Sequence, residues 1–238
     1  MSFHKSIFLL LTILPLTGCQ SGVRNVAISP GSESGKQMLE MDANGRAYQN
    51  AGRFSQAIRE FESTHGGDCM DLVFDSLQEP GLKLSGHVRL YMMEAKSASC
   101  GSKLFCARLT FTDSANTVAK RAEILFGPDD VSNYQSKAAE FIRYAQAGDV
   151  QQMLAITSSL TRATQSDSIR TVYADQVVPQ FQGTTVTWNS RSVPNVDEKN
   201  NVGLIITGTA QGKTTFSFDL ALFKENGKFV VANIQKHH

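Results

Sequence analysis

The chain has almost no excess of charge of either sign. It carries 23 lysines and arginines against 22 aspartates and glutamates, a formal net charge of +1 over 238 residues. Proteins that bind nucleic-acid phosphates or an anionic lipid surface commonly have an excess of basic residues or a polybasic run, and this sequence has neither. We therefore expect no nucleic-acid partner.

The sequence also lacks the short motifs of common catalytic sites. It contains no G-x-S-x-G, H-E-x-x-H, G-x-x-x-x-G-K-[ST] or G-x-G-x-x-G pattern, and its cysteines form no C-x-x-C pair. His237 and His238 are a terminal pair without a neighbouring carboxylate. These absences predict no catalytic residue, no metal ligand and no cofactor, so an enzyme is the less favoured interpretation.

Long apolar runs are absent, and the apolar stretch near the start covers only residues 7–16, after Lys5. A membrane-spanning helix needs about 20 apolar residues. The short stretch therefore indicates the apolar region of an export signal. It ends in Leu16-Thr17-Gly18-Cys19, which resembles the lipobox of bacterial lipoproteins: an aliphatic residue, a small residue, Gly or Ala, then Cys.

The lipoprotein resemblance implies a location. In that family, residues 1–18 would be a signal peptide, and Cys19 would carry the lipid and begin the mature chain. Two or more acyl chains anchor a protein firmly in a bilayer. Residue 20 is Gln rather than the Asp common in proteins kept at the inner membrane. The resemblance thus implies a cell-envelope protein, at the outer membrane and facing the periplasm rather than at the inner membrane.

The remaining 220 residues (238 − 18) are enough for one large domain or two small ones. Residues 19–36 are rich in Ser and Gly and predict a flexible tether. Residues 37–127 predict a helical hairpin with a turn at Ala51-Gly52, followed by about three antiparallel strands. A short helix is expected over residues 68–77, before Pro80.

Three cysteines remain if Cys19 is lipidated, and an exported chain meets an oxidising compartment where disulfides form. The segment CGSKLFC places Cys100 and Cys106 on either side of a Gly-Ser-Lys turn signal, which favours a Cys100–Cys106 disulfide across a hairpin. Cys69 is then a buried free thiol, or the true partner of one of the other two. Sequence alone does not decide the connectivity.

Residues 128–238 predict three helices followed by four strands. Gly148 and Asp149 mark the end of the first helix and the cap of the second. Strict alternation of Phe216, Phe218, Leu220 and Leu222 indicates a strand with one buried face, and Asn226-Gly227 is a hairpin turn signal.

This order is similar to the NTF2-like (cystatin-like) superfamily, and the helix–Ala-Gly-Asp–helix segment AAEFIRYAQAGDVQQMLAI resembles its opening. The resemblance, over about residues 130–236, implies an α+β fold with helices packed on a curved antiparallel sheet. It also implies a cone-shaped pocket and, in many members, a homodimer through the outer sheet face. The residues expected to line that pocket are Tyr144, Tyr173, Trp188, Phe216 and Phe218.

Two functions are compatible with this pattern. The favoured hypothesis is a lipid-anchored envelope lipoprotein with a non-catalytic binding or assembly role, whose partner is another envelope protein or a small ligand. The alternative is a small-molecule isomerase or hydrolase that uses the NTF2-like pocket. Its pocket carboxylate would need an apolar wall to raise its proton affinity. Asp219 does not fit, because strand alternation places it on the face opposite Phe218 and Leu220.

Overall fold

The computed structural model describes residues 50–112, 119–164 and 166–237. The predicted signal segment 1–18, the lipidation residue Cys19, the tether 19–36 and the first helix of the predicted hairpin lie outside these residues. The turn expected at Ala51-Gly52 was wrong, because both residues belong to the first turn of α3, which begins at Ala51 after its N-cap residue Asn50.

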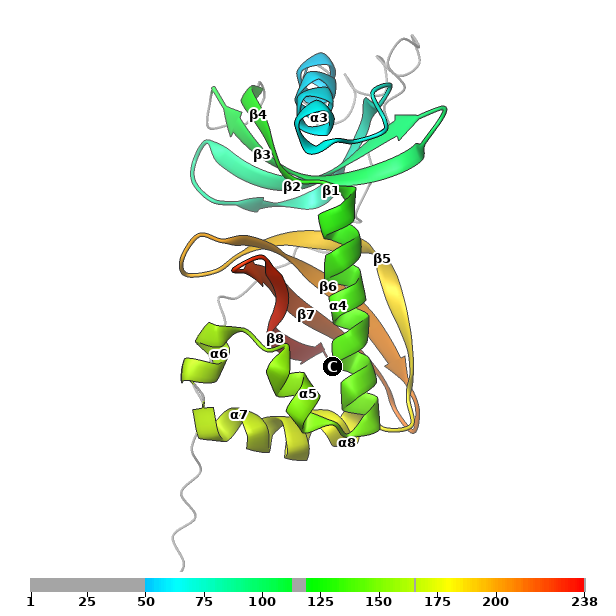
Figure 1. Cartoon of the computed structure of the whole chain (residues 1–238), viewed down its shortest axis with the longest axis vertical. Helices are drawn as coiled ribbons and strands as arrows, with labels where there is room; N and C mark the ends of the chain where they lie inside the picture. Colours follow the sequence, from blue (N-terminus) through cyan, green and yellow to red (C-terminus); the bar gives the residue numbers. More distant parts are fainter. Residues whose placement is uncertain (1–49, 113–118, 165, 238) are drawn as a thin grey trace, which may run out of the picture.

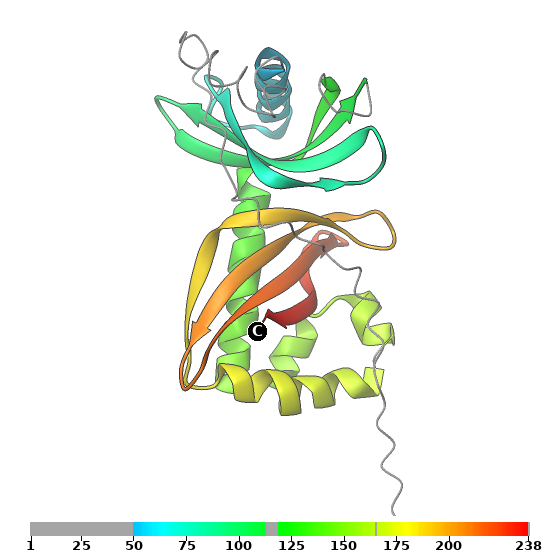
Figure 2. The same ribbon diagram turned by 180° about the vertical axis from the view of Figure 1, so that it is seen from behind.

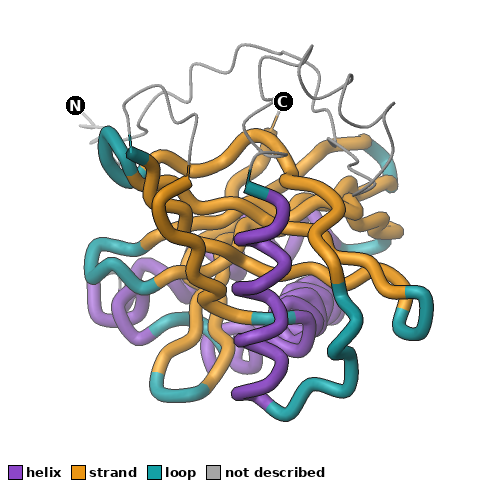
Figure 3. The backbone as a smooth tube through the Cα atoms, turned by 90° about the horizontal axis from the view of Figure 1, so that it is seen from above, coloured by secondary structure: helices purple, strands orange, loops and turns teal. Residues whose placement is uncertain are grey.

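The first half of the described chain is a four-stranded antiparallel sheet, sheet A, with the strand order β1-β2-β3-β4. Helix α3 lies across one face of this sheet, as the view from above shows (Figure 3). The bounds of these elements are α3 Ala51–His65, β1 Val73–Lys83, β2 Val88–Ser97, β3 Gly101–Phe111 and β4 Ala119–Phe126.

Sheet A is buried on both faces at its centre. Residues 90–93 of β2 are all buried, although neighbouring residues of a strand point to opposite faces. Met93 faces α3 and packs in a cluster with Phe54 and Ile58, whereas Met92 belongs to the core of the second half of the chain. Phe54 of α3 makes an edge contact with Phe74 of β1, with 5.0 Å between the ring centroids.

The expectation of a short helix before Pro80 was wrong, because this segment forms β1. The strand lies at the edge of sheet A and pairs only with β2. Its register shifts between Gln78 and Leu82, around Pro80. Proline lacks the N–H that a central strand requires, but a bulged edge strand tolerates it. Tertiary pairing with β2 and burial of Phe74 under α3 therefore decide the conformation here.

The second half begins with a long helix, which is followed by four short α-helices and one π-helical turn. A second four-stranded antiparallel sheet, sheet B, comes next, with the order β5-β6-β7-β8. The helices are α4 Pro128–Ala147, α5 Val150–Ala155, α6 Ser159–Thr164, α7 Ser166–Val172 and α8 Val178–Phe181, with a π-helical turn at Tyr173–Val177 between the last two. The strands are β5 Thr185–Val196, β6 Val202–Gln211, β7 Thr215–Glu225 and β8 Lys228–His237.

Several local predictions for this half are confirmed. Helix α4 ends at Gly148, whose φ of 74° is left-handed, and Asp149 caps α5 by accepting a hydrogen bond of 3.1 Å from the backbone N–H of Gln152. Asn226 and Gly227 have φ values of 50° and 77°, as a tight hairpin turn requires. Along β7, buried and partly buried residues alternate from Phe216 to Leu222.

The predicted fold class is confirmed: the chain is α+β, with helices packed on antiparallel sheets. Figure 1 shows α3 above sheet A, and sheet B below it with α4 to α8. The view from behind shows the same order (Figure 2). The predicted boundary at residues 127 and 128 falls between β4 and α4, and it stays a prediction, since Cys106 and Phe126 of sheet A join the core around α4. None of the described helices is long and apolar enough to cross a membrane.

Candidate functional site

The disulfide joins Cys69 to Cys100, so the predicted Cys100–Cys106 pairing was wrong. Gly101–Phe111 is one continuous strand, and the hairpin turn precedes it. Six residues of extended strand separate two cysteines by about 20 Å, far beyond the roughly 7 Å that a disulfide spans between Cα atoms. Cys106 is a buried free thiol, and burial raises its pKa to about 12, so it is not a ready nucleophile.

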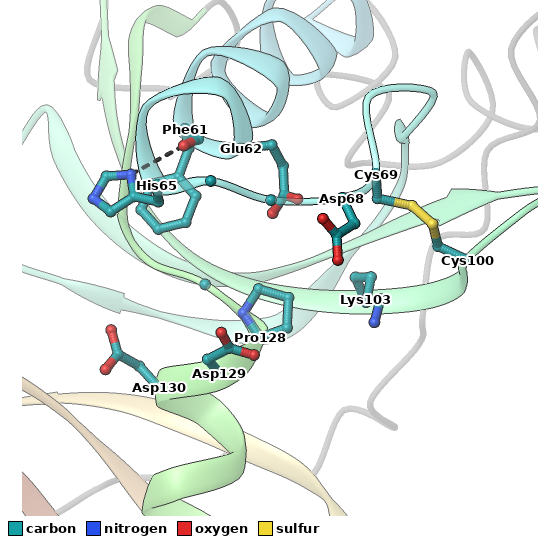
Figure 4. A pocket seen from close by; sticks show the side chains of 13 residues that line it. Phe61, Glu62, His65, Asp68, Cys69, Cys100, Lys103, Pro128, Asp129 and Asp130 are labelled. Atoms are coloured by element: carbon teal, nitrogen blue, oxygen red, sulfur yellow. Dashed lines mark hydrogen bonds between the residues drawn. A yellow bond between two sulfur atoms is a disulfide. The ribbon is translucent and has the colours of Figure 1, made fainter.

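The disulfide forms one wall of a cavity of about 360 Å³ between the end of α3 and the start of α4 (Figure 4). Three separate segments supply the walls: the end of α3 with the loop after it, the start of β3, and the β4–α4 junction. The lining residues are Phe61, Glu62, His65, Gly66, Gly67, Asp68, Cys69, Cys100, Lys103, Gly127, Pro128, Asp129 and Asp130.

Two glycines make room for the side chains of this cavity. A Cβ on Gly67 would lie 1.9 Å from Oε2 of Glu62, and a Cβ on Gly127 would lie 2.6 Å from the ring of Phe61. A side chain at either position would therefore force Glu62 or Phe61 to move from its place in the cavity wall. Gly66 ends α3 with a left-handed φ of 72°, which turns the chain toward Cys69. The local sequence His65-Gly66-Gly67 thus shapes the wall of the cavity at the end of α3.

Glu62 is the buried carboxylate of the cavity, with only 7% of its surface exposed. Burial raises the pKa of its carboxyl above the ordinary value for glutamate. Lys103 opposes this rise, Asp129 and Asp68 reinforce it, and a hydrogen bond from the backbone N–H of Cys69 opposes it. Within the described part of the chain, Glu62 forms no ion pair with a lysine or arginine. A buried carboxylate with one amide donor is therefore incompletely compensated.

The remaining charges of the cavity are mainly acidic. Asp68 follows α3, and Asp129 and Asp130 belong to the first turn of α4. Asp130 is engaged elsewhere, because Lys224 Nζ lies 2.9 Å from its Oδ1. Lys103 is the single lysine or arginine among the described lining residues. The cavity thus has an excess of negative charge, and Glu62 is the most buried of its carboxylates.

An aromatic wall closes the cavity on the side of α3. The rings of Phe61 and His65 stack with a centroid separation of 4.0 Å. Nδ1 of His65 lies 3.0 Å from the carbonyl oxygen of Phe61, which fixes the imidazole over the helix end. Pro128 and the disulfide add further apolar surface (Figure 4). Apolar walls around a carboxylate suit an organic cation, which has an apolar body and a charged end.

Among the described residues, the carboxylates of the cavity do not belong to a group of three or more ligand atoms close enough to hold one metal ion. Within residues 50–112, 119–164 and 166–237, the only group of three or more His, Cys, Asp or Glu ligand atoms within 4.8 Å of one another is Cys69, Asp71 and Cys100. The sulfur atoms of Cys69 and Cys100 are bonded to each other in the disulfide, so they are not available as metal ligands. The described lining of the cavity also contains no hydroxyl or free thiol that could act as a nucleophile.

The five residues predicted to line an NTF2-like pocket lie in or beside sheet B. Tyr173 and Phe218 are 2% and 0% exposed, and Phe216 is 7% exposed. Phe181 packs edge-on against both phenylalanines, at 5.3 Å and 4.9 Å between ring centroids. These rings fill the space between sheet B and its helices at this point.

The other predicted lining residues lie nearer the surface. Trp188 is 37% exposed and rests on Phe218, with 5.7 Å between centroids. Tyr144 is half-buried on α4 and donates a hydrogen bond of 2.8 Å to Glu140. The hydroxyl of Tyr173 is 2.9 Å from that of Thr157. None of the five lines the acidic cavity.

Sequence reasoning missed the acidic cavity. Its residues come from positions 61–69, 100–103 and 127–130, and no spacing pattern links them. The one local sign of the cavity in the sequence was His65-Gly66-Gly67, where two adjacent glycines end a helical segment that contains Glu62. The chain matches no protein-family model, and no curated protein matches its sequence.

Proposed function

We propose that this chain is a lipid-anchored lipoprotein of the bacterial cell envelope, held at the outer membrane and facing the periplasm, with a non-catalytic binding role. Two observations support the location. Leu16-Thr17-Gly18-Cys19 resembles a lipobox at the end of a short apolar stretch. The Cys69–Cys100 disulfide is typical of proteins that fold in an oxidising compartment.

The binding site is the acidic cavity, and its ligand carries an ammonium or guanidinium group on a small molecule or on an envelope protein. The observation that carries this assignment is Glu62, a carboxylate 7% exposed with a raised pKa and no ion-pair partner among the described residues. A bound cation would compensate its charge, and the ring of Phe61 would cover the cation's apolar part.

A binding role is better supported than an isomerase or hydrolase. Where the resemblance implies a catalytic pocket, Phe181, Phe216 and Phe218 pack together. Asp219 accepts a hydrogen bond from Thr207 at 2.6 Å and lies 2.7 Å from His237, so it is a paired carboxylate. A general base of the isomerase type is an unpaired carboxylate in an apolar wall, accompanied by a tyrosine that stabilises the oxyanion. Glu62 meets the first condition, but the described lining of its cavity contains no tyrosine.

The anchor is tested by Cys19→Ser in the full chain, expressed in its own envelope. Loss of the acceptor thiol should move the protein from the membrane fraction to the soluble fraction, or leave it with an uncleaved signal. Mass spectrometry of the wild type should show a chain that begins at Cys19 and carries acyl groups. Cys106→Ala is the control and should remain in the membrane fraction. A wild-type protein with a bare thiol at Cys19 would refute the anchor.

The cation site is tested separately with Glu62→Gln. The probe is N-acetyl-lysine methylamide, and N-acetyl-norleucine methylamide is its uncharged counterpart. A charge-assisted hydrogen bond contributes about 1.5–3 kcal/mol, so Glu62→Gln should weaken binding of the lysine probe by about tenfold or more. Glu198→Gln removes the same charge from an exposed loop and should change the affinity by less than about twofold. Calorimetric titration at low salt measures both.

The pH dependence has a definite sign. Protonation removes the charge of Glu62, and its raised pKa means that this happens at a higher pH than for an ordinary glutamate. Affinity for the lysine probe should therefore fall as the pH is lowered, and the decrease should be absent in Glu62→Gln. Because the folded-state pKa is raised, the stability of the wild type relative to Glu62→Gln should fall as the pH rises through that pKa. Equal binding of the two probes by the wild type would refute the cation site and leave the anchor untouched.

A further inference from the structure

The far end of sheet B has a charge pattern opposite to that of the acidic cavity. Two neighbouring cavities of about 550 and 470 Å³ lie around the β6–β7 turn, and both are lined by Thr214, Phe216 and Lys236. Figures 1 and 2 both place this turn beside the connection from α8 to β5. The lining therefore combines a hairpin turn, the end of β8 and a helix–strand connection.

No aspartate or glutamate belongs to the described lining of either cavity, whereas Lys213, Lys236 and His237 do. This contrasts with the whole chain, where acidic and basic residues are nearly equal in number. One carboxylate outside the lining contacts a lining residue: Oδ2 of Asp219 lies 2.7 Å from Nε2 of His237. Asp219 also accepts a hydrogen bond of 2.6 Å from Thr207. Asp219 therefore fixes the orientation of the His237 imidazole.

The ammonium group of Lys236 is held in place by an aromatic ring. Its Nζ lies 4.6 Å from the centroid of Phe216, whose side chain is only 7% exposed. In the strand register, Lys236 is opposite Phe218 and His237 is opposite Ser217. Lys236 and His237 therefore point to opposite faces of β8, and Lys213 approaches from the neighbouring turn. The basic side chains thus come from two separate segments, the β6–β7 turn and the end of β8.

Hydroxyl groups complete the set of hydrogen-bond donors. Thr214 lines both cavities and Ser217 lines one of them. Thr184 lines the other, but its hydroxyl already donates a hydrogen bond of 2.7 Å to the carbonyl oxygen of Phe181. A phosphate group offers several acceptor oxygens and up to two negative charges. Two lysines and hydroxyl donors, in a described lining without aspartate or glutamate, match that chemistry.

We propose that these two cavities form a binding site for the phosphate group of an anionic ligand, with Lys213 and Lys236 as its charged contacts. The phosphate belongs to a soluble phosphorylated compound or to an anionic phospholipid headgroup. The site is independent of the acidic cavity, so it does not depend on the function proposed above.

The experiment uses the full chain with Cys19→Ser, so that no lipid confounds membrane binding. In one arm, inorganic phosphate and pyrophosphate are titrated at low salt, and amide and side-chain NMR shifts are followed. In the other arm, the protein is sedimented with vesicles of phosphatidylglycerol and with vesicles of phosphatidylcholine. Each arm is repeated with Lys213→Gln/Lys236→Gln. The control is Lys199→Gln/Lys228→Gln, which changes the net charge equally in hairpin turns at the other end of sheet B.

The proposal predicts saturable shifts at the β6–β7 turn with phosphate, preferential sedimentation with phosphatidylglycerol, or both. Binding in the first arm alone assigns a soluble ligand, and binding in the second alone assigns a headgroup. In either case, Lys213→Gln/Lys236→Gln should weaken binding by about tenfold or more, and the control by less than about twofold. Absence of binding in both arms, or equal loss in the two double variants, overturns the proposal. Circular dichroism establishes that both variants are folded.

Discussion

Replacing Phe218 by alanine is expected to lower the free energy of unfolding by about 3–5 kcal/mol, because a large cavity would remain in the core. The side chain is fully buried in β7. Its ring contacts Phe181 at 4.9 Å, Trp188 at 5.7 Å and Phe216 at 6.3 Å between centroids. Gly208 of β6 lies beneath it, and a Cβ there would be 2.5 Å from the ring. The ring therefore fills the place of a side chain on the neighbouring strand.

Urea unfolding followed by circular dichroism measures this loss. Leu84→Ala is the control, because Leu84 is 40% exposed and its truncation should cost no more than about 0.5 kcal/mol. Gly208→Ala tests the same packing from the other strand and should also destabilise, since the new methyl group has no free space. A loss below about 1 kcal/mol for Phe218→Ala would mean that this interior is open, which would favour the isomerase or hydrolase hypothesis.

Removal of the disulfide is expected to be almost as costly. The Cys69–Cys100 link closes a loop with a sequence separation of 31 residues. By the chain-entropy relation, a loop of this length contributes about 3.7 kcal/mol of stability. Cys69→Ala/Cys100→Ala should therefore unfold at a correspondingly lower urea concentration. The loop also holds the backbone N–H of Cys69 against Glu62, so the double variant should lose affinity for the lysine probe as well.

Cys106→Ala is the matched control for the pairing itself. It should retain one disulfide by mass spectrometry, and dithiothreitol should lower its stability as it does that of the wild type. Dithiothreitol should have no further effect on Cys69→Ala/Cys100→Ala. Loss of the disulfide in Cys106→Ala would contradict the pairing described here and show that Cys106 is one of the bonded cysteines.

Much of the second half could be predicted because its signals are local. Gly148 followed by Asp149 separates two helices whatever surrounds them, and Asn226-Gly227 sets a tight turn by its own φ preferences. The alternation along β7 is clear because one face is buried and the other is not. In sheet A, the central strand β2 is buried on both faces, so its apolar run carries no such period.

What could not be predicted depends on contacts between distant segments. β1 is a strand because it pairs with β2, and its own sequence contains Pro80, which argues against a strand. Cys100 meets Cys69 only because the β2–β3 turn folds over the loop after α3. The same arrangement brings Glu62, Lys103 and Asp129 together, and no short-range pattern encodes it.

Helix α4 connects the two charged regions of the protein. Its first turn lines the acidic cavity, and at its other end Gly148 lies close to Gln182, which lines one of the basic cavities. A helix of 20 residues is about 30 Å long. Salt at physiological concentration screens exposed charges over about 8 Å. A ligand bound in the acidic cavity should therefore not change, through its charge, the affinity of the cavities lined by Lys213 and Lys236. A single molecule that bridged both regions would have to be an extended one.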